Sequence, residues 1–384
     1  MIYLDSAATT IVHKNVADAI YNSLVEDIGN PSSLHRLGLE AELKIRNAKK
    51  IVADLLKVER GSIIFTSGGT EANNLAVVGG ALARRRYGNH IITTHLEHPS
   101  ILEAFAHLQK QGFDISYISV DSKGYIDLEK LKASLREDTI LVSIIHVNNE
   151  IGTIQPIDEA TNIVKSHSKH IYMHVDAIQS FGKLKLYPKQ TGIDLLTFSA
   201  HKIHGPKGIG GLYIGEGIML HSLVHGGGQE GGLRSGTENL SGIIGLAEAV
   251  KFVTPYIKQD INPMYELKKI LCESILDKVK DARINGPDIL EGAPHILSMS
   301  FPGINAQTML HALEQRDIYV STGAACSSRT ADISYVLKNI GLPRDIAKSA
   351  IRFSLSYMNT KDELFGIGEI VGEIVDELRP FIRR

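Results

Sequence analysis

The chain has 384 residues, of which 43% are hydrophobic and 22% are charged. Because single domains usually run to roughly 100–200 residues, this length predicts two or three domains. A formal net charge of −2 excludes a global positive field that would attract nucleic acid or an anionic membrane. The composition shows no collagen-like, low-complexity or disordered signature, so we expect an ordinary globular protein.

Targeting segments and cysteine content indicate the cellular compartment of a protein. The first residues lack a basic region followed by an apolar run, and no stretch approaches the ~18 continuous apolar residues of a spanning helix. We therefore expect a cytoplasmic protein that does not contact membranes. The two cysteines, Cys272 and Cys326, are too few for a disulfide framework or a cysteine-rich zinc site, which leaves a reactive thiol as one use.

The segment from about residue 60 to 215 alternates short β-branched runs with amphipathic helical patterns. Strands are expected at residues 62–65, 90–94, 115–120, 140–147, 171–175 and 195–198. Strict alternation predicts an α/β fold, a mostly parallel sheet with helices on both faces. In such sheets ligands bind at the carboxyl ends of the strands, so the polar residues after each run are candidate site residues.

The last third of the chain has a different pattern. A long helical pattern runs from about residue 250 to 280, and mixed strands and helices follow, which predicts a smaller α+β domain. The N-terminal piece reads as extended and could pack on either domain. We assign residues 13–250 to a large cofactor-binding domain, and 1–12 with 251–384 to a small domain that carries Cys326.

A candidate anion site follows the first expected strand, in TSGGTE at 66–71. The backbone can approach a ligand closely at Gly69, Thr70 can donate its hydroxyl, and a helix N-terminus offers unpaired N–H groups, which suits phosphate. An ordinary strand-to-helix turn with a capping threonine fits the same residues. The spacing differs from that of a nucleotide P-loop.

A candidate reactive lysine follows the strand expected at 195–198, in SAHKIHGPKG at 199–208. Lys202 lies between hydrogen-bonding side chains and a glycine-rich loop, a setting that suits Schiff-base formation, although a solvated loop lysine is the alternative. The pair His201 and His204 lacks a third ligand, so no metal site is expected.

A candidate carboxylate ends another strand, in HVDAIQ at 174–179. Asp176 can keep a pyridinium nitrogen protonated, as an aldehyde cofactor that acts as an electron sink requires. The same residue can instead cap the next helix.

Together these motifs resemble the aminotransferase class V branch of the pyridoxal-phosphate enzymes, most closely the cysteine desulfurases of the NifS/IscS type. Similar motifs run through nearly the whole chain. They are LDSAATT at 4–10, GNPSSLH at 29–35, SGGTEANN at 67–74, EH at 97–98, NNEIG at 148–152, HVDAIQ, SAHKIHGPKG, HGGGQEGGLRSGTEN at 225–239, STGAACSS at 321–328 and AIRFSL at 350–355.

The resemblance implies pyridoxal-phosphate fold type I, as in aspartate aminotransferase, with pyridoxal 5'-phosphate as cofactor. It implies that Lys202 binds the cofactor and shuttles the α-proton. Asp176 would pair with the pyridine nitrogen and Gln179 with the phenolic oxygen, while His98 would stack on the ring and move protons. The residues implied around the phosphate and the rest of the cofactor are Gly69, Thr70, Asn149, Ser199, His201 and, from the other subunit of a homodimer, Thr237.

The resemblance also implies that Asn149 and Arg352 hold the substrate carboxylate, for which a guanidinium fork is well shaped. From the residues alone, His98 fits a surface histidine and Asn149 fits a turn. The glycine-rich stretch at 226–237, which contains Thr237, fits a surface loop equally well.

The two cysteines lie in different settings. Cys272 lies in a helical pattern and is expected to be structural. Small residues surround Cys326, and Arg329 could favour its thiolate. The resemblance implies that Cys326 takes sulfur from L-cysteine as a persulfide, leaves L-alanine, and passes the sulfur to an acceptor protein for iron–sulfur cluster assembly or thiolation. Selenocysteine lyase, another class V activity and a non-catalytic sulfur-binding role are the alternatives.

Overall fold

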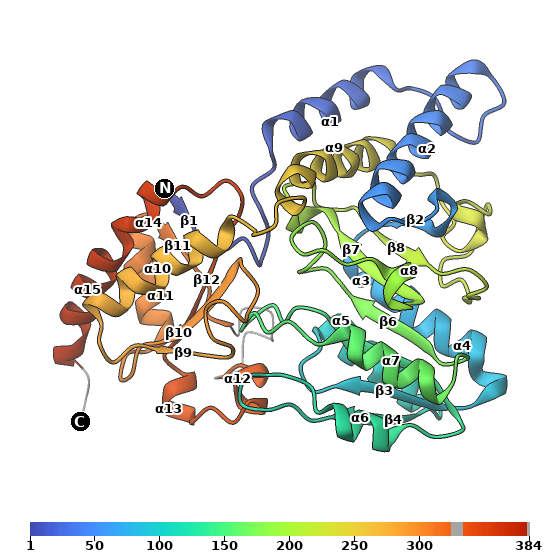
Figure 1. Cartoon of the computed structure of the whole chain (residues 1–384). Helices are drawn as coiled ribbons and strands as arrows, with labels where there is room; N and C mark the ends of the chain where they lie inside the picture. The colour runs from blue at the N-terminus through green and yellow to red at the C-terminus, as the bar shows by residue number, and fades with distance from the viewer. Residues whose placement is uncertain (324–332, 382–384) are drawn as a thin grey trace.

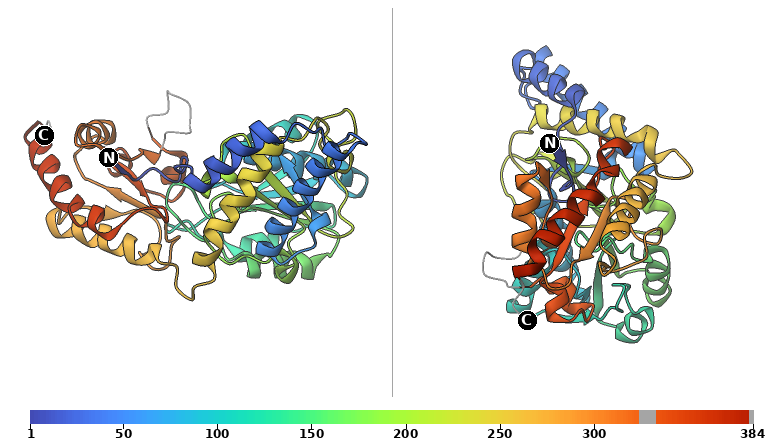
Figure 2. Two further views of the ribbon diagram at one scale, coloured as in Figure 1. Left: turned by 90° about the horizontal axis from the view of Figure 1, so that it is seen from above. Right: turned by 90° about the vertical axis from the view of Figure 1, so that its left-hand side faces the viewer.

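The computed structural model describes residues 1–323 and 333–381. Within them the chain forms a larger body on a seven-stranded sheet and a smaller body on a three-stranded sheet (Figure 1). Seen from above, the molecule is elongated, with the smaller body at one end (Figure 2). The first strand and the last helix both lie in this smaller body, so the chain leaves it early and returns to it.

The larger sheet has the strand order β2-β8-β7-β6-β5-β3-β4. Neighbours from β7 to β4 pair in parallel, whereas β8 is antiparallel to both β7 and β2. The mostly parallel sheet that the sequence predicts is therefore confirmed. The strands are β2 (Ile63–Thr66), β3 (His90–Thr94), β4 (Asp114–Ile118), β5 (Thr139–Ile145), β6 (Tyr172–Asp176), β7 (Leu195–Ser199) and β8 (Gly210–Ile214).

Strand β8 is absent from the sequence prediction because it begins with two glycines, which are uncommon in strands. Its neighbours explain them. A Cβ on Gly211 would lie 2.4 Å from the ring of Phe198 in β7, and one on Gly210 would lie 2.7 Å from the backbone of Gly68. Glycine therefore lets β8 pack between β7 and β2.

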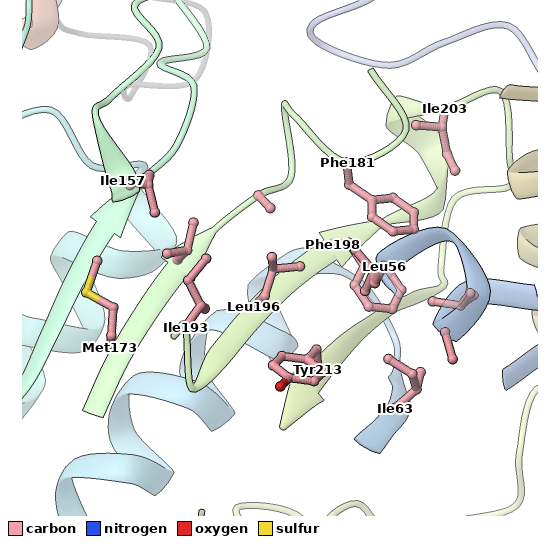
Figure 3. Packing of buried hydrophobic residues seen from close by; sticks show 14 of the residues in the cluster. Leu56, Ile63, Ile157, Met173, Phe181, Ile193, Leu196, Phe198, Ile203 and Tyr213 are labelled. Carbon is pink, nitrogen blue, oxygen red and sulfur yellow. The ribbon is translucent and has the colours of Figure 1, made fainter. Parts of the chain in front are cut away.

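Helices cover both faces of the larger sheet, as predicted. Successive residues of β2 enter different cores: Ile63 packs into the core beneath α2, α7 and α9, and Ile64 packs into the core beneath α3 and α5. Figure 3 shows Leu56 of α2 against Ile63, Phe198 and neighbouring side chains in the first of these cores. The helices of this body are α1 (Lys14–Glu26), α2 (Arg36–Leu56), α3 (Gly69–Asn74), α4 (Gly80–Arg84), α5 (Pro99–Lys110), α6 (Leu128–Ser134), α7 (Ile157–His167), α8 (Pro188–Thr191) and α9 (Leu240–Ile257).

The smaller body has its own core. Its sheet has the order β12-β10-β9, and β1 pairs in parallel with β11 beside it, which places the N-terminal segment in this body (Figure 1). The strands are β1 (Ile2–Tyr3), β9 (Arg283–Ile284), β10 (Ile296–Ser300), β11 (Ile318–Tyr319) and β12 (Ala350–Ser354). The helices are α10 (Met264–Lys278), α11 (Ala306–Gln315), α12 (Tyr335–Asn339), α13 (Arg344–Ala347), α14 (Lys361–Phe365) and α15 (Ile367–Leu378).

The helical pattern expected from residue 250 to 280 is two helices, α9 and α10. Val250 and Ile257 of α9 belong to the larger core, and Leu267 of α10 packs into the smaller one. The change of core thus falls in the link between these helices, while the division into domains at residue 250 stays a prediction. Among the described residues α9 alone is long and apolar enough to span a membrane, but 56% of it is buried inside the protein, as in a core helix.

Candidate active site

A cavity of about 290 Å³ lies at the carboxyl ends of the central strands. The last residues of three adjacent strands line it: Ile145 of β5, Asp176 of β6 and Ser199 of β7. This is the edge at which α/β sheets bind ligands. The full lining is Ala7, Ala8, Gly69, Thr70, His98, Ser100, Ile145, Asn149, Asp176, Ile178, Gln179, Ser199, His201, Lys202 and Arg352.

The residues that the resemblance assigns to the cofactor, the substrate and the sulfur all lie in this lining except Thr237 and Cys326. Thr237 is exposed and does not line the cavity. Cys326 lies outside the described residues. The structure thus brings together the side chains expected around the ring, the phosphate and the substrate carboxylate of the cofactor complex, although they come from segments far apart in the chain.

Lys202 follows β7 in a short 3-10 turn and points toward the N-terminal segment. Its Nζ donates hydrogen bonds to the carbonyl oxygens of Ala7 at 2.6 Å and Ala8 at 2.7 Å. These carbonyls belong to the LDSAATT motif, so this motif crosses from the smaller body to line the site. The position beside a cavity favours the reactive role of Lys202 over a solvated loop lysine.

Asp176 is almost fully buried, with 1% of its surface exposed. Its Oδ1 accepts from the backbone N–H of Ile178 at 2.9 Å, and its Oδ2 accepts from Nδ2 of Asn73 at 2.8 Å. Burial raises the pKa of this carboxyl, and the hydrogen bonds and the neighbouring Lys202 oppose the rise. The hydrogen bond from the Ile178 N–H is the local contact expected if Asp176 only capped the following turn. The remaining lone pairs of the Asp176 carboxylate suit a cationic ring nitrogen.

His98 is the N-cap of α5 and lies at the cavity wall. Its Nδ1 accepts the backbone N–H of Ser100 at 3.1 Å. Because a backbone N–H can only donate, Nδ1 carries no proton, and the imidazole proton is on Nε2. Burial lowers the pKa of His98, with Asp176 opposing and Lys202 adding to the effect, so the ring is neutral near pH 7.

The expected phosphate end combines a glycine with buried hydroxyl and imidazole groups. A Cβ on Gly69 would lie 2.3 Å from Cδ1 of Ile178, so glycine lets the start of α3 pack directly against this side chain of the turn after β6. Ser199 Oγ is buried and has no hydrogen-bond partner among the described residues. Burial and the nearby Lys202 lower the pKa of His201 to about 4, which leaves it neutral. The side chain of Thr70 is exposed.

Arg352 enters the cavity from β12 of the smaller body and is 3% exposed. Its Nη1 donates to the backbone carbonyl of Asn149 at 2.9 Å, and its Nη2 donates to Oδ1 of Asp5 at 2.7 Å. Within the described chain, Nε of Arg352 and Oδ1 of Asn149 are buried without partners. A buried guanidinium with spare donors is suited to a carboxylate ligand.

The structure adds supporting residues that the sequence analysis missed. His295 Nε2 lies 3.2 Å from Oε1 of Gln179, whose Nε2 donates to the carbonyl of Ala7 at 2.9 Å, so His295 orients the Gln179 amide. Asn73 and Ser100 connect to Asp176 and His98. Asn73 lies in the SGGTEANN motif beside Asn74, and the sequence alone does not show which of the two asparagines supports the site. His295 is more than a hundred positions away from its partner Gln179, so no local pattern connects them.

The site fits an anionic aldehyde cofactor with a basic ring nitrogen. A lysine, a buried carboxylate and an unpartnered buried hydroxyl, Ser199 Oγ, face one cavity. In the described parts of the chain, no group of three or more His, Cys, Asp and Glu side chains is arranged to hold a metal ion.

The family model of aminotransferase class V matches residues 2–365. The chain belongs to this family. Its relatives include the cysteine desulfurase IscS of Dictyoglomus turgidum, 42% identical over 378 residues that cover 98% of this chain and 95% of the relative. The cysteine desulfurase IscS of Buchnera aphidicola subsp. Schizaphis graminum is 43% identical over 383 residues, covering 98% and 93%.

Solved structures similar to this chain confirm the fold. A NifS-like protein superposes with a TM-score of 0.90 at 38% identity, covering 98% of this chain and 99% of the other. The structure described as SspA in complex with cysteine superposes with a TM-score of 0.81 at 34% identity, covering 92% of this chain and 99% of the other. The family and the pyridoxal-phosphate fold type I expected from the motifs are therefore confirmed.

Proposed function

We propose that the protein is a pyridoxal-phosphate-dependent cysteine desulfurase, which converts L-cysteine to L-alanine and holds the sulfur as a persulfide on Cys326. The observation that carries the proposal is the convergence of Lys202, Asp176 and Arg352 on one cavity. The chain's similarity to IscS proteins over 98% of its length supports the choice among class V activities.

The cofactor would be held by the residues already described. Lys202 would bind its aldehyde carbon, Asp176 its ring nitrogen and Gln179 its phenolic oxygen. Its phosphate would meet Gly69, Thr70, Ser199 and His201, while His98 would lie over the ring and Asn149 beside it. When bound, the cofactor supplies an electron sink that stabilises negative charge at the substrate α-carbon.

The protein's own groups orient the substrate and move its protons. The Arg352 guanidinium and the Asn149 amide would bind the substrate carboxylate, which fixes the α-carbon relative to Lys202. Lys202 would take the α-proton as a general base once its amine is displaced by substrate, and return it later. His98, neutral with its proton on Nε2, can donate that proton at the cavity wall.

Cys326 would carry the sulfur transfer. Its thiolate attacks the substrate sulfur, and the new S–S bond forms as the C–S bond breaks. The electron pair of the broken bond stays on the substrate β-carbon, which takes up a proton and becomes the methyl group of alanine. The persulfide then passes its outer sulfur to an acceptor protein, for which an iron–sulfur scaffold or a thiolation protein is proposed.

We also propose a homodimer in which Thr237 of each subunit completes the phosphate site of the other. Thr237 is exposed and lies outside its own subunit's cavity. Large apolar side chains are exposed on and beside α1, including Tyr21 at 67%, Leu24 at 69% and Ile28 at 78%. Exposed apolar clusters of this kind are typical of contact surfaces.

Product analysis with L-cysteine and a reductant tests the activity. The expected result is alanine and sulfide in equal amounts, formed only when pyridoxal 5'-phosphate is bound. Pyruvate and ammonia in place of alanine would overturn the proposal, and alanine formed from selenocysteine but not from cysteine would assign the selenocysteine lyase alternative.

A further inference from the structure

Asn73 lies behind the cavity wall and uses all the hydrogen-bonding groups of its amide. Its side chain is fully buried, at 0% exposure, and it does not line the cavity. Nδ2 donates one hydrogen to Oδ2 of Asp176 at 2.8 Å and the other to Oγ of Ser100 at 2.9 Å, while Oδ1 accepts the hydroxyl of Thr197 at 2.6 Å. One residue thus bridges β6, β7 and the start of α5.

The amide can take only one orientation. If nitrogen and oxygen were exchanged, the amide oxygen would face the carboxylate of Asp176, and two acceptors would meet in a buried site. Thr197 reinforces the observed orientation, because its hydroxyl donates to the amide oxygen. Asp176 and Thr197 are register partners on neighbouring strands, so both can reach the same amide. The hydroxyl of Thr197 therefore holds the oxygen of Asn73 while Asp176 holds the nitrogen.

The second hydrogen of the amide leads to His98. Because Ser100 Oγ accepts from Asn73, its own hydroxyl hydrogen can be given to Nδ1 of His98, which lies 2.8 Å away. His98 Nδ1 already accepts the backbone N–H of Ser100. The hydroxyl thus adds a second donor to an acceptor that only the neutral imidazole provides.

We propose that Asn73 is a positioning residue that couples Asp176 to His98. Its amide holds the carboxylate of Asp176, which is assigned to the ring nitrogen of the cofactor. Through Ser100 the same amide holds His98, which is assigned to the face of the cofactor ring. The inference rests on the proposed function, because it assigns these two partners to pyridoxal 5'-phosphate. The link by itself is a property of the chain and can be measured apart from turnover.

The experiment compares variants of the full-length protein in two measurements. The first is the dissociation constant of pyridoxal 5'-phosphate, followed by visible absorbance. The second is the pH at which His98 titrates, followed by NMR of ¹⁵N-histidine-labelled protein, with His98→Gln to assign the signal. The variants are Asn73→Leu, Thr197→Val and Ser100→Ala. The control is Asn74→Leu, whose parent side chain donates to the Thr70 carbonyl within the helix.

Asn73→Leu is expected to weaken cofactor binding about tenfold or more, since a hydrogen bond to a buried carboxylate is lost. Thr197→Val is expected to weaken it by a smaller factor, because the amide loses the group that orients it. Ser100→Ala is expected to raise the titration pH of His98, because it removes a donor to the neutral ring. Asn74→Leu should change neither quantity.

Asn73→Leu and Thr197→Val proteins that fold and bind the cofactor as tightly as the parent would overturn the inference. If Asn73→Leu does not fold, Thr197→Val decides the question. A parent protein that binds no pyridoxal 5'-phosphate would refute the proposed function instead. In that case an unchanged His98 titration in Ser100→Ala would refute the link through Ser100, and a raised one would support it.

Discussion

Arg352 Nη2 donates to Oδ1 of Asp5 at 2.7 Å, so the guanidinium assigned to the substrate is held by a carboxylate from the opposite end of the chain. Asp5 belongs to the segment that also supplies the carbonyl partners of Lys202. The N-terminal residues therefore position a binding group and a catalytic group at once.

We predict that Arg352→Lys raises KM for L-cysteine about tenfold or more, because a lysine cannot reproduce a fork that binds Asp5, Asn149 and substrate together. Steady-state kinetics measures the effect, and kcat should fall less than kcat/KM. Arg316→Lys is the matched control, since Arg316 forms surface pairs with Glu373 and Glu377 away from the cavity. A KM for Arg352→Lys equal to that of the parent would refute the assigned carboxylate site.

Lys202→Ala is predicted to lose the borohydride-reducible bond to pyridoxal 5'-phosphate and to lose turnover. Peptide mass spectrometry after reduction locates the bond. Lys207→Ala, five residues further along the same loop and exposed, should retain it. The competing position is Lys183, which is buried and whose pKa burial lowers to about 7. A reduced adduct on Lys183 in the parent protein would show that the reactive lysine is misassigned.

Glu97, next to His98, gives a prediction for stability against pH. It is fully buried, and Oε1 accepts from Thr94 and from the backbone of Ile145, while Oε2 has no partner among the described residues. Burial raises its pKa from 4.5 to about 8. The folded state therefore binds a proton that the unfolded state releases between these values, and the Glu97 contribution to stability falls as pH rises through this range.

Glu97→Gln should remove this dependence, because the amide keeps the acceptor and never ionises. Relative to the parent, the variant should gain stability by up to about 1.4 kcal/mol for each pH unit between pH 5 and 8. Urea unfolding at several pH values measures the difference. Glu314→Gln, an exposed control on α11, should show no such trend. A difference between Glu97→Gln and parent that is constant with pH would contradict the assignment.

The dimer proposal predicts that the protein sediments at twice its chain mass of 42.0 kDa. If Thr237 acts in the neighbouring subunit, Thr237→Val should bind pyridoxal 5'-phosphate more weakly than the parent. Co-expressed Thr237→Val and Lys202→Ala subunits should form hybrid dimers in which one site has both side chains, with higher activity than the two separate variants together. Full activity in a strictly monomeric sample would refute the shared site.

The sequence predicted much of the architecture because the sheet follows local rules. The run at 90–94 is a strand with the predicted bounds, and the other predicted runs differ from their strands by a few residues. Strand β8 was missed because glycine has a low strand propensity. Gly210 and Gly211 are needed there because neighbouring residues, Phe198 in particular, leave no room for a Cβ atom. Such a requirement arises only when the strands are assembled.

The site was predictable where a residue lies at or soon after the carboxyl end of a strand, as Asp176 and Lys202 do, and where a motif resembles a family. Supporting residues gave no such signal. Asn73 and His295 act on Asp176 and Gln179 through side-chain contacts between segments far apart in the chain. A buried amide or histidine in a sequence looks the same whether it supports a site or a core.

A comparison of the two cysteines tests the proposed sulfur transfer most directly. Cys272 is a buried thiol in the smaller core, and burial raises its pKa to about 11, so it is a poor nucleophile. Cys326 is the proposed sulfur acceptor. Cofactor binding and α-proton removal depend on other residues, so Cys326→Ser should keep the cofactor and still change its absorbance when cysteine is added.

The measurement is the yield of protein-bound persulfide and alanine from L-cysteine, compared among the parent, Cys272→Ser and Cys326→Ser. We predict that Cys272→Ser matches the parent, whereas Cys326→Ser forms no protein persulfide and little alanine. Alanine and sulfide released by Cys326→Ser at the parental rate would contradict the account, because sulfur would then leave the substrate without the proposed nucleophile.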